Sequence, residues 1–489
     1  MNYPKSLYTL TIATIIILSI CVFMPPSITV LVSSLSFAII VWKKPKWIIP
    51  LLIMYFSVRP FLLEINDGLK LAGDAAIITL FIRVTWDAVK KKNFKQLYQL
   101  EWYEWAYILF CTVGAISALF TDVMLVAIIF QLRKFLIMYV LFYGVKRLEW
   151  QQQDFFAIMK LTVGVALVLI AHGFVEKLSQ RQWLLPETWV DMFLSPANAD
   201  RIYGLLGNPN SMAMYLFIAM VASLILLNIT KQKIWYIPAI LGFGTFLMTY
   251  SRGSMIAIFA VVAFYLLVTK SKQFLKQFII IGILGYVCVF TPVEFIDNEI
   301  ENIQGTVEQG DENSNQNSTI GDRFGSSFSE ENISLSGNTG RLFFVKKGFE
   351  ILSSHLVIGT GFGTFGDSAA LVYSSPIYEE YGLKGIYSYI GRDFYSDNQY
   401  IQIIVQTGIV GTLLFALFML NMLWHMWQTR KENVAFANIL MSLWVFVAIV
   451  GIVYNVWENQ MFTFCYFTLL AWMEIVRRGK LKGITRTDH

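Results

Sequence analysis

The chain has 489 residues, of which 56% are hydrophobic and only 15% are charged, and its mean hydropathy is +0.57. Because soluble domains carry about 25% charged residues, this composition excludes a soluble globular protein. The net charge of +5 does not indicate a nucleic-acid partner, and the four cysteines form no CxxC or ligand-spaced cluster that would support a disulfide framework or a zinc site.

Hydrophobic runs of about 17 to 25 residues, long enough to cross a bilayer, recur along the chain. They predict an all-α polytopic membrane protein with about fourteen transmembrane helices, within a range of about 12 to 14. The first run is interpreted as a retained helix, since no small-residue cleavage motif follows it. The expected spans are 7–24, 27–42, 47–63, 71–89, 104–120, 123–144, 155–175, 209–229, 234–250, 253–269, 277–291, 398–422, 434–456 and 459–476.

The expected topology follows from Lys and Arg, which concentrate in cytoplasmic loops. With the N-terminus inside, every basic loop lies on the cytoplasmic face. Both termini are then cytoplasmic, and a long polar segment after residue 291 is extracytoplasmic. The basic loops are those near 43–46, 90–95, 146–147, 231–233, 270–276 and 430–431.

The span pattern divides the chain into five parts. Within the extracytoplasmic loop, residues 297–337 are rich in Asn, Ser, Glu and Gly and are expected to be flexible. Residues 338–397 are expected to be ordered, because apolar residues there regain helical spacing. The parts are N-terminal transmembrane helices (1–200), a transmembrane core with a Ser-Arg-Gly motif (201–291), the extracytoplasmic loop (292–397), C-terminal transmembrane helices (398–476) and a cytoplasmic tail (477–489).

Two arginines are expected in the first turn of a helix on the outer face. Ser251 precedes Arg252 where one span ends and the next begins, and it is expected to cap the new helix. Arg341 starts a helix in the outer segment, with Asn338 or Thr339 as its N-cap. Unpaired backbone N–H groups beside an arginine suit a phosphate, and two such arginines could hold a diphosphate. The alternatives are that Arg252 snorkels at the membrane edge and that Arg341 is a solvated loop residue.

Asp397 and Asn398 lie at the start of the following span, with Tyr400 close behind. A partly desolvated carboxylate at a membrane boundary would suit a general base, and the neighbouring Asn398 and Tyr400 would bind substrate. The alternative is an ordinary helix N-cap. Arg201 and Asn210 face the same side and, together with Ser251, could bind the acceptor sugar or simply close a loop.

Charged residues inside spans are costly and often functional. Arg133 and Lys134 lie near mid-membrane in an otherwise apolar helix, so we expect them to bind substrate. Arg59 and Asp74, nearer the outer face, could line a cavity or pair with each other. The glycine-rich stretch 359–363 lacks a Lys-Ser/Thr partner and is interpreted as a turn outside the membrane rather than a phosphate loop.

Five short motifs follow one another between about residues 200 and 425. Arg201 precedes Gly-Asn-Pro-Asn-Ser at 207–211, followed by Thr-Tyr-Ser-Arg-Gly-Ser at 249–254 and Thr-Gly-Arg-Leu at 339–342. Gly-Thr-Gly-Phe-Gly-Thr-Phe at 359–365 and the run from Asp397 to Gly411 complete the series. Their order resembles the O-antigen ligase/polymerase family of bacterial membrane glycosyltransferases, which use polyprenyl-diphosphate-linked glycans.

This resemblance implies a GT-C-like fold and a metal-independent, inverting transfer, without a cofactor, outside the cytoplasmic membrane. It implies that Arg252 and Arg341 bind the diphosphate. Where the family usually has a histidine, its proposed base or acceptor-orienting group, this chain has Asp397. That difference is more typical of polymerases of Gram-positive envelopes, such as teichuronic acid polymerases of the TuaE type.

The resulting hypothesis is a polysaccharide polymerase of the bacterial cytoplasmic membrane, with a ligase that uses a different acceptor as an open alternative. Its partners would be a polyprenyl-diphosphate-linked oligosaccharide donor, a glycan acceptor, the lipid bilayer and envelope polysaccharide assembly proteins, with no nucleic acid. One rival class is a polysaccharide transporter or flippase, although the two halves show no obvious sequence repeat. The other is a non-catalytic assembly scaffold, which predicts that arginine substitutions are silent.

Overall fold

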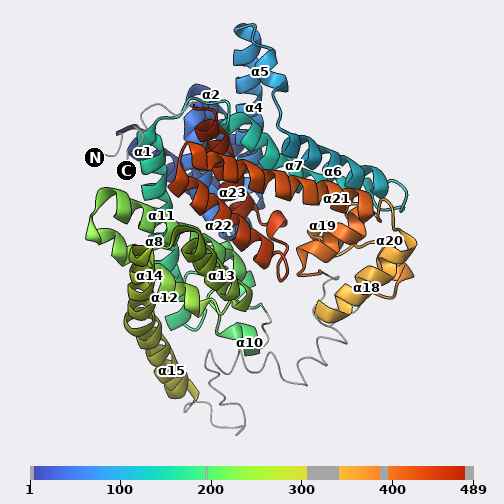
Figure 1. Cartoon of the computed structure of the whole chain (residues 1–489). Helices are drawn as coiled ribbons and strands as arrows, with labels where there is room; N and C mark the ends of the chain where they lie inside the picture. Colours follow the sequence, from blue (N-terminus) through green and yellow to red (C-terminus); the bar gives the residue numbers. More distant parts are fainter. Residues whose placement is uncertain (1–4, 193, 195, 306–340, 386–394, 480–489) are drawn as a thin grey trace.

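The computed structural model describes residues 5–192, 194, 196–305, 341–385 and 395–479, and the regular elements in these ranges are all helices (Figure 1). Eight of the described helices or helix runs are long and apolar enough to cross a membrane. They confirm an all-α polytopic membrane protein. Helices occupy all the expected spans, but several are shorter or less apolar than these eight, so the count of about fourteen stays a prediction.

The long helices are α1 (Lys5–Val22), α2 (Pro26–Lys43), α3 (Ile48–Ile65), α4 (Ala72–Lys90), α6 (Trp102–Ala118), α7 (Leu125–Val145), α8 (Gln152–Leu178), α11 (Pro209–Thr230), α12 (Tyr236–Met248), α13 (Arg252–Thr269), α14 (Lys272–Gly285), α15 (Thr291–Gly305), α18 (Arg341–Ser354), α21 (Gln399–Gln428), α22 (Val434–Val450) and α23 (Gln460–Arg477). Short helices include α5 (Lys95–Tyr98), α9 (Glu187–Val190), α10 (Pro196–Ala199), α19 (Ser368–Tyr373) and α20 (Pro376–Glu380). A 3₁₀ turn, η8 (Val456–Glu458), joins α22 to α23.

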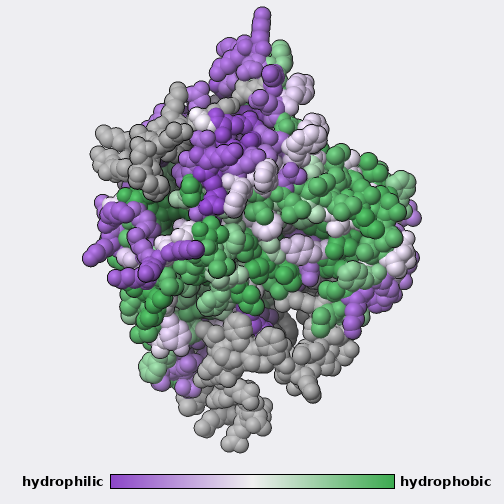
Figure 2. All heavy atoms as spheres, in the orientation of Figure 1, coloured by the Kyte–Doolittle hydropathy of each residue, from purple (hydrophilic) through white to green (hydrophobic). Residues whose placement is uncertain are grey.

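On the face shown in Figure 2, apolar residues form a broad band across the middle of the molecule, next to a hydrophilic end. Helix α5, from a basic loop, lies at one end, while α10 and α15 lie at the opposite end (Figure 1). The apolar band is the surface that a bilayer would cover. The end that carries α10 and α15 is the one for which the distribution of Lys and Arg predicts an extracytoplasmic location.

Helix α14 continues beyond the point where the outer segment was expected to begin. A π-helical turn, Tyr286–Phe290, joins it to α15, so residues up to Gly305 are helical. Lys177 of α8 explains this extension, because its Nζ lies 2.6 Å from Asp297 and 3.4 Å from Glu294 on α15. Residues 297–305, expected to be flexible, are therefore helical. The same expectation for 306–337 lies outside the described residues.

The glycine-rich stretch, expected as a turn on the outer side, is buried against α6 and α7. Phe362 donates its N–H to the carbonyl of Gly114 on α6 over 2.9 Å, and its ring stacks on Phe135 of α7 at 5.2 Å between centroids. Gly361 has φ +93°, and a Cβ there would lie 2.0 Å from the backbone nitrogen of Ala118. Only glycine permits so close an approach to α6.

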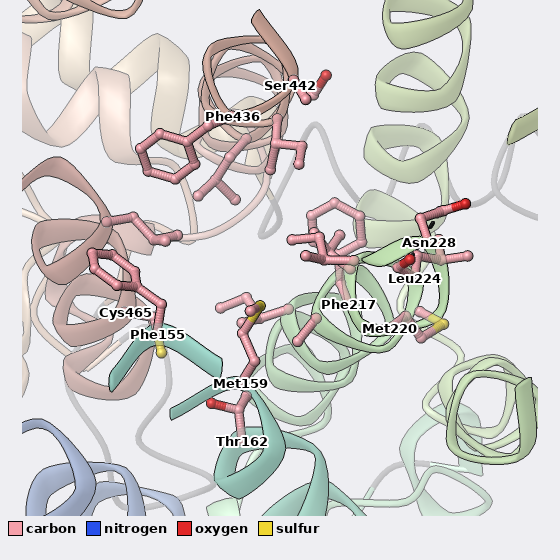
Figure 3. Close-up of a pocket in the computed structure, with 18 of the residues that line it drawn as sticks. Phe155, Met159, Thr162, Phe217, Met220, Leu224, Asn228, Phe436, Ser442 and Cys465 are labelled. Carbon is pink, nitrogen blue, oxygen red and sulfur yellow. Dashed lines mark hydrogen bonds between the residues drawn. The ribbon is translucent and has the colours of Figure 1, made fainter. Parts of the chain in front are cut away.

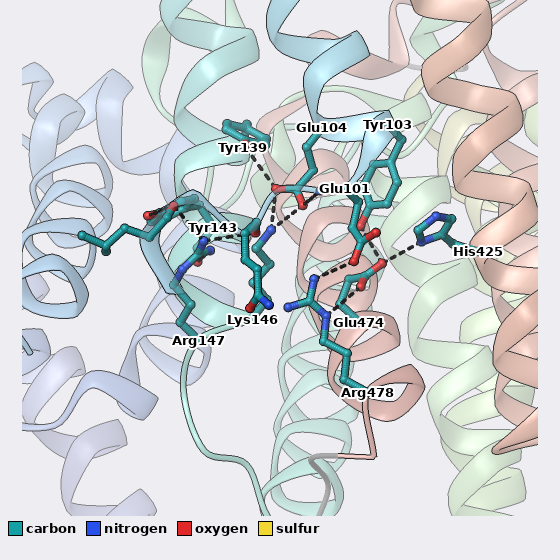
Figure 4. A network of polar contacts seen from close by, with 12 residues as sticks. Glu101, Tyr103, Glu104, Tyr139, Tyr143, Lys146, Arg147, His425, Glu474 and Arg478 are labelled. Carbon is teal, nitrogen blue, oxygen red and sulfur yellow. Dashed lines mark hydrogen bonds and ion pairs between the residues drawn. The ribbon is translucent and has the colours of Figure 1, made fainter. Parts of the chain in front are cut away.

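A buried polar network joins α6, α7, α21 and α23 at the predicted cytoplasmic end (Figure 4). Glu104 accepts hydrogen bonds from Lys146 at 2.5 Å and from Tyr139 at 3.1 Å. Glu474 accepts from Tyr103 at 2.9 Å and contacts His425 at 3.1 Å. Two of the basic residues counted as loop charges stabilise this network: Arg477, which bonds Glu101 and Glu474, and Lys146.

Candidate functional site

Three predicted substrate-binding residues form one hydrogen-bonded cluster at the end that the distribution of Lys and Arg predicts to be extracytoplasmic. Asn210 lies in the first turn of α11, and its Oδ1 accepts from Arg201 Nη2 at 3.2 Å and from Ser251 Oγ at 2.8 Å. Arg201 also donates through Nε to the carbonyl of Thr249 at 2.8 Å. The cluster therefore ties the loop before α11 to the turn between α12 and α13.

That turn is tight and places Arg252 at the first position of α13. Tyr250 adopts a left-handed conformation with φ +47°, which reverses the chain after α12. Ser251 was expected to cap α13, but its hydroxyl donates to Asn210 and contacts Ser254 Oγ at 2.8 Å instead. The side chain of Arg252 is exposed, whereas both serines are buried. An exposed arginine thus stands on a rigidly held helix start.

Gly253 lets this helix start pack against the loop between α22 and α23. A Cβ at Gly253 would lie 2.2 Å from Cγ2 of Val453. We expect Gly253→Ala to displace Arg252 and to lower activity at least about tenfold, a loss equivalent to about 1.4 kcal/mol of transition-state binding. Gly282→Ala on α14 is the matched control, because nothing lies within 4 Å of its Cβ position. Measured transfer rates that fell equally in both variants would contradict this account.

Asp397 lies in a left-handed turn, with φ +45°, directly before α21. Asn398 is the N-cap of that helix, since its side chain accepts from the N–H groups of Tyr400 at 3.0 Å and Ile401 at 3.1 Å. Asp397 is thus not the helix cap, which was the alternative considered for it. Tyr400 points to α22, where its hydroxyl donates to the carbonyl of Ala448 at 2.7 Å.

The turn at Asp397 and the start of α13 meet the same loop. Gln399 donates its N–H to the carbonyl of Gly451 at 2.9 Å, while Gly253 packs on Val453 two residues further along. Arg341 is the first residue of α18, and Gly348 of that helix packs on Ile401 of α21. The fold therefore brings the three chain segments that carry Arg252, Arg341 and Asp397 to the region around the start of α21. The expected caps of α18, Asn338 and Thr339, lie outside the described residues.

A polar cavity of about 380 Å³ lies beside this region, within the 300–1,000 Å³ typical of ligand pockets. It is formed by the end of α3, the first half of α7, the start of α11 and the loop between α22 and α23. The polar residues of its lining include Arg59, Arg133, Lys134, Asn208, Ser211, Glu458, Asn459 and Gln460. The predicted extracytoplasmic ends of these helices meet here.

Carboxylates bind two of the three cations of the cavity. Arg133 Nε donates to Asp74 Oδ2 over 2.6 Å. Lys134 Nζ donates to Ser368 Oγ and lies 3.6 Å from Glu458 Oε2. Glu458 also accepts from Gln131 at 2.8 Å and from Gln402 at 2.6 Å. Lys134 thus belongs to a network that includes Gln402 near the start of α21, whereas Arg133 pairs with Asp74 of α4.

Two further groups next to the cavity carry shifted pKa values. Burial, together with the nearby Glu458 carboxylate, raises the pKa of Asp367 to about 7. Burial also raises the pKa of Tyr454 in the loop between α22 and α23, so its hydroxyl stays protonated at neutral pH. Tyr454 Oη lies 3.3 Å from Ser211 Oγ, and Asn459 donates to that same serine at 2.5 Å. Tyr454, Ser211 and Asn459 thus form a neutral, hydrogen-bonded wall of the cavity.

A second cavity, of about 520 Å³, has a different chemical character (Figure 3). Side chains of α8, α11, α22 and α23 line it, among them Met159, Phe217, Phe436 and Cys465. No Asp, Glu, Lys, Arg or His of the described residues lines it. It includes the starts of α8, α14 and α22, which the topology places at the cytoplasmic side. This cavity suits hydrocarbon and has no group for transfer chemistry.

The sequence reasoning missed two residues of the polar cavity, Glu458 and Asn459. Both lie in the short connection between the last two spans, where a polar residue is expected in any case. Glu458 could have been noticed as a carboxylate that follows Tyr454 and Trp457 between the last two spans. The predicted topology places this connection on the same side of the membrane as Arg201 and Asp397. An acidic residue at this boundary could have been paired with Lys134 by topology alone.

Comparison with known proteins identifies the central part of the chain. Residues 237–416 match a family model described as O-Antigen ligase. No curated protein matches the chain significantly. The matched region contains the turn at Arg252, helix α18 and the turn at Asp397, which the fold gathers around the start of α21. This region is therefore similar to an O-antigen ligase domain, and the match supports the O-antigen ligase/polymerase family that the motifs resemble.

Proposed function

We propose that this protein polymerises polyprenyl-diphosphate-linked glycan repeat units at the outer face of the bacterial cytoplasmic membrane. The family match supports a ligase- or polymerase-like role in glycan assembly. The single observation that carries the proposal is the packing of the Arg252, Arg341 and Asp397 segments around the start of α21, beside a polar cavity. A glycosyltransferase needs a leaving-group site and a base at one place, whereas a scaffold does not.

The proposed reaction is an inverting transfer without a metal. Arg252 and Arg341 bind the diphosphate leaving group and neutralise its developing charge. Asp397 accepts the proton of an acceptor hydroxyl, which attacks the anomeric carbon from the opposite side as the bond to the diphosphate breaks. Arg201, Asn210 and Ser251 hold the turn that carries Arg252. The two termini lie in the cytoplasm in this proposal.

The decisive experiment uses the purified full-length protein in lipid nanodiscs with polyprenyl-diphosphate-linked repeat units. A ladder of products at multiples of the repeat, lost in Arg341→Ala, establishes a polymerase. Transfer that occurs only after a second acceptor is added identifies a ligase instead. Unconsumed substrate with each acceptor offered contradicts a transferase and favours a transporter or scaffold. Teichuronic acid repeat units test the Gram-positive polymerase proposal directly.

Asp397→Asn tests the base without disturbing the backbone, because Asn adopts the left-handed conformation as readily as Asp. We expect the transfer rate to fall by about 10²- to 10⁴-fold, the usual contribution of a general base. Thermal stability should stay near that of the wild type. A variant with the wild-type rate would remove Asp397 from this role and leave the two arginine assignments standing.

A further inference from the structure

Arg59 stands apart from the other two cations of the polar cavity. Arg133 and Lys134 each have a carboxylate within ion-pair distance, from Asp74 and Glu458 respectively. Within the ranges that the structure describes, no carboxylate lies within 4.0 Å of the Arg59 guanidinium. Its Nη2 donates to the carbonyl of Lys70 over 3.3 Å, a neutral acceptor.

The surroundings of Arg59 make this positive charge costly. The charge of Lys134 is close enough to repel it, and Phe56, Pro60 and Phe130 add apolar walls to the same cavity. A cation within a transmembrane helix is usually retained only where it pairs, lines a water-filled path or binds a ligand. Arg59 lines a polar cavity of about 380 Å³, which meets the second of these conditions and makes room for the third.

The same cavity also has neutral hydrogen-bonding groups in its lining. Ser211, Tyr454 and Asn459 form a connected set at 2.5 to 3.3 Å, and Asn459 Oδ1 is occupied by the N–H of Phe462. Hydroxyl and amide groups of this kind bind the hydroxyls of a sugar. A cation and such neutral groups in one cavity suit a sugar that carries a negative charge.

We propose that this cavity is a subsite for an anionic sugar of the glycan, a uronic acid or a sugar phosphate, whose charged group pairs with Arg59. The inference rests on the proposed function and adds the charge of the substrate to it. Arg59 is a specificity-determining residue in this proposal, separate from the diphosphate-binding arginines at the starts of α13 and α18. The neutral wall of Ser211, Tyr454 and Asn459 bonds the hydroxyls of the same sugar.

The test compares three polyprenyl-diphosphate-linked glycans that differ at one sugar only: glucuronic acid, glucose obtained by reducing its carboxyl group, and glucose 6-phosphate. Transfer rates are measured in nanodiscs for the wild type, for Arg59→Gln and for Arg83→Gln. Gln keeps a donor for the carbonyl of Lys70 but removes the charge. Arg83 is the matched control, since it also lies within a span but pairs with Asp87 at 3.1 Å, near the cytoplasmic end.

We expect the wild type to use an acidic glycan at least about tenfold faster than the glucose form, as one charge-assisted bond predicts. Arg59→Gln should remove this preference, while Arg83→Gln should keep it. The acidic glycan whose transfer rate falls in Arg59→Gln identifies the bound anion as a carboxylate or a phosphate. Equal rates with all three glycans in the wild type, or an equal fall in Arg59→Gln, would overturn the inference.

Failure of the proposed function gives a different result, because the wild type would then transfer none of the three glycans. In that case equilibrium binding of the same glycans decides the question. Weaker binding of an acidic form by Arg59→Gln than by Arg83→Gln would support the subsite. Identical affinities in the two variants would overturn it.

Discussion

Arg252→Ala should lower the rate of glycan transfer by about 10²- to 10³-fold, the usual cost of losing one preorganised donor to developing charge. The side chain stands at the first position of α13, where the helix dipole and free backbone N–H groups add to its attraction for a phosphate. Product ladders and initial rates from purified protein measure this effect. Michaelis constants taken with them separate weaker substrate binding from slower chemistry.

Protein yield and thermal stability should change little in Arg252→Ala, because the side chain of Arg252 is exposed and the buried bonds of Ser251 to Asn210 and Ser254 hold the turn. Arg252→Lys keeps the charge without the bidentate geometry and should recover only part of the rate. Arg430→Ala, at the predicted cytoplasmic side, is the control and should transfer normally. A fully active Arg252→Ala would refute the assigned role.

Glu104→Ala should destabilise the fold by about 3 to 5 kcal/mol, because it leaves the ammonium of Lys146 buried without a partner. Lys146 is 5% exposed and Glu104 fully buried, and the two join α6 to α7. Tyr139 would lose an acceptor at the same time. The midpoint of thermal unfolding in detergent, followed by loss of soluble monomer, measures the change.

The matched control for Glu104→Ala is Lys347→Ala, which removes a surface ion pair between Lys347 and Glu350 on α18. Exposed pairs of this kind contribute only about 0 to 1 kcal/mol. The control should therefore unfold within a few degrees of the wild type. If Glu104→Ala unfolded at the same temperature as this control, the network of Figure 4 would not stabilise the protein as described.

The helices could be predicted from sequence because backbone groups in a bilayer must bond within their own segment, so each span is coded locally. The role of Lys146 could not be read in this way. From the sequence, a basic residue after a span indicates only a cytoplasmic loop. The packing of α6 against α7 is what brings Lys146 to Glu104. Similarly, the extension of α15 depends on Lys177, which lies more than one hundred residues earlier.

The candidate site was predictable as far as its motifs were contiguous. Arg201, Asn210 and Ser251 were named from their motifs, and the structure joins them by hydrogen bonds. The capping residues were less predictable, because Ser, Asp and Asn can each cap a helix start. Asn398 rather than Asp397 caps α21, and the hydroxyl of Ser251 bonds Asn210 rather than the backbone of α13. The pairing of Glu458 with Lys134 was open to prediction from the topology, but its contact with Gln402 depends on how the helices pack.

The burial of Phe362 between α6 and α7 has a consequence for how the chain is made. Ribosomes deliver α6 and α7 to the membrane more than two hundred residues before this segment, so the two helices must wait with Phe110, Phe135 and Ala118 incompletely packed. The segment closes that gap just before α21 is inserted. We therefore expect nascent chains that end near residue 355 to remain sensitive to membrane proteases and to recruit insertion chaperones, whereas chains that include α21 become resistant.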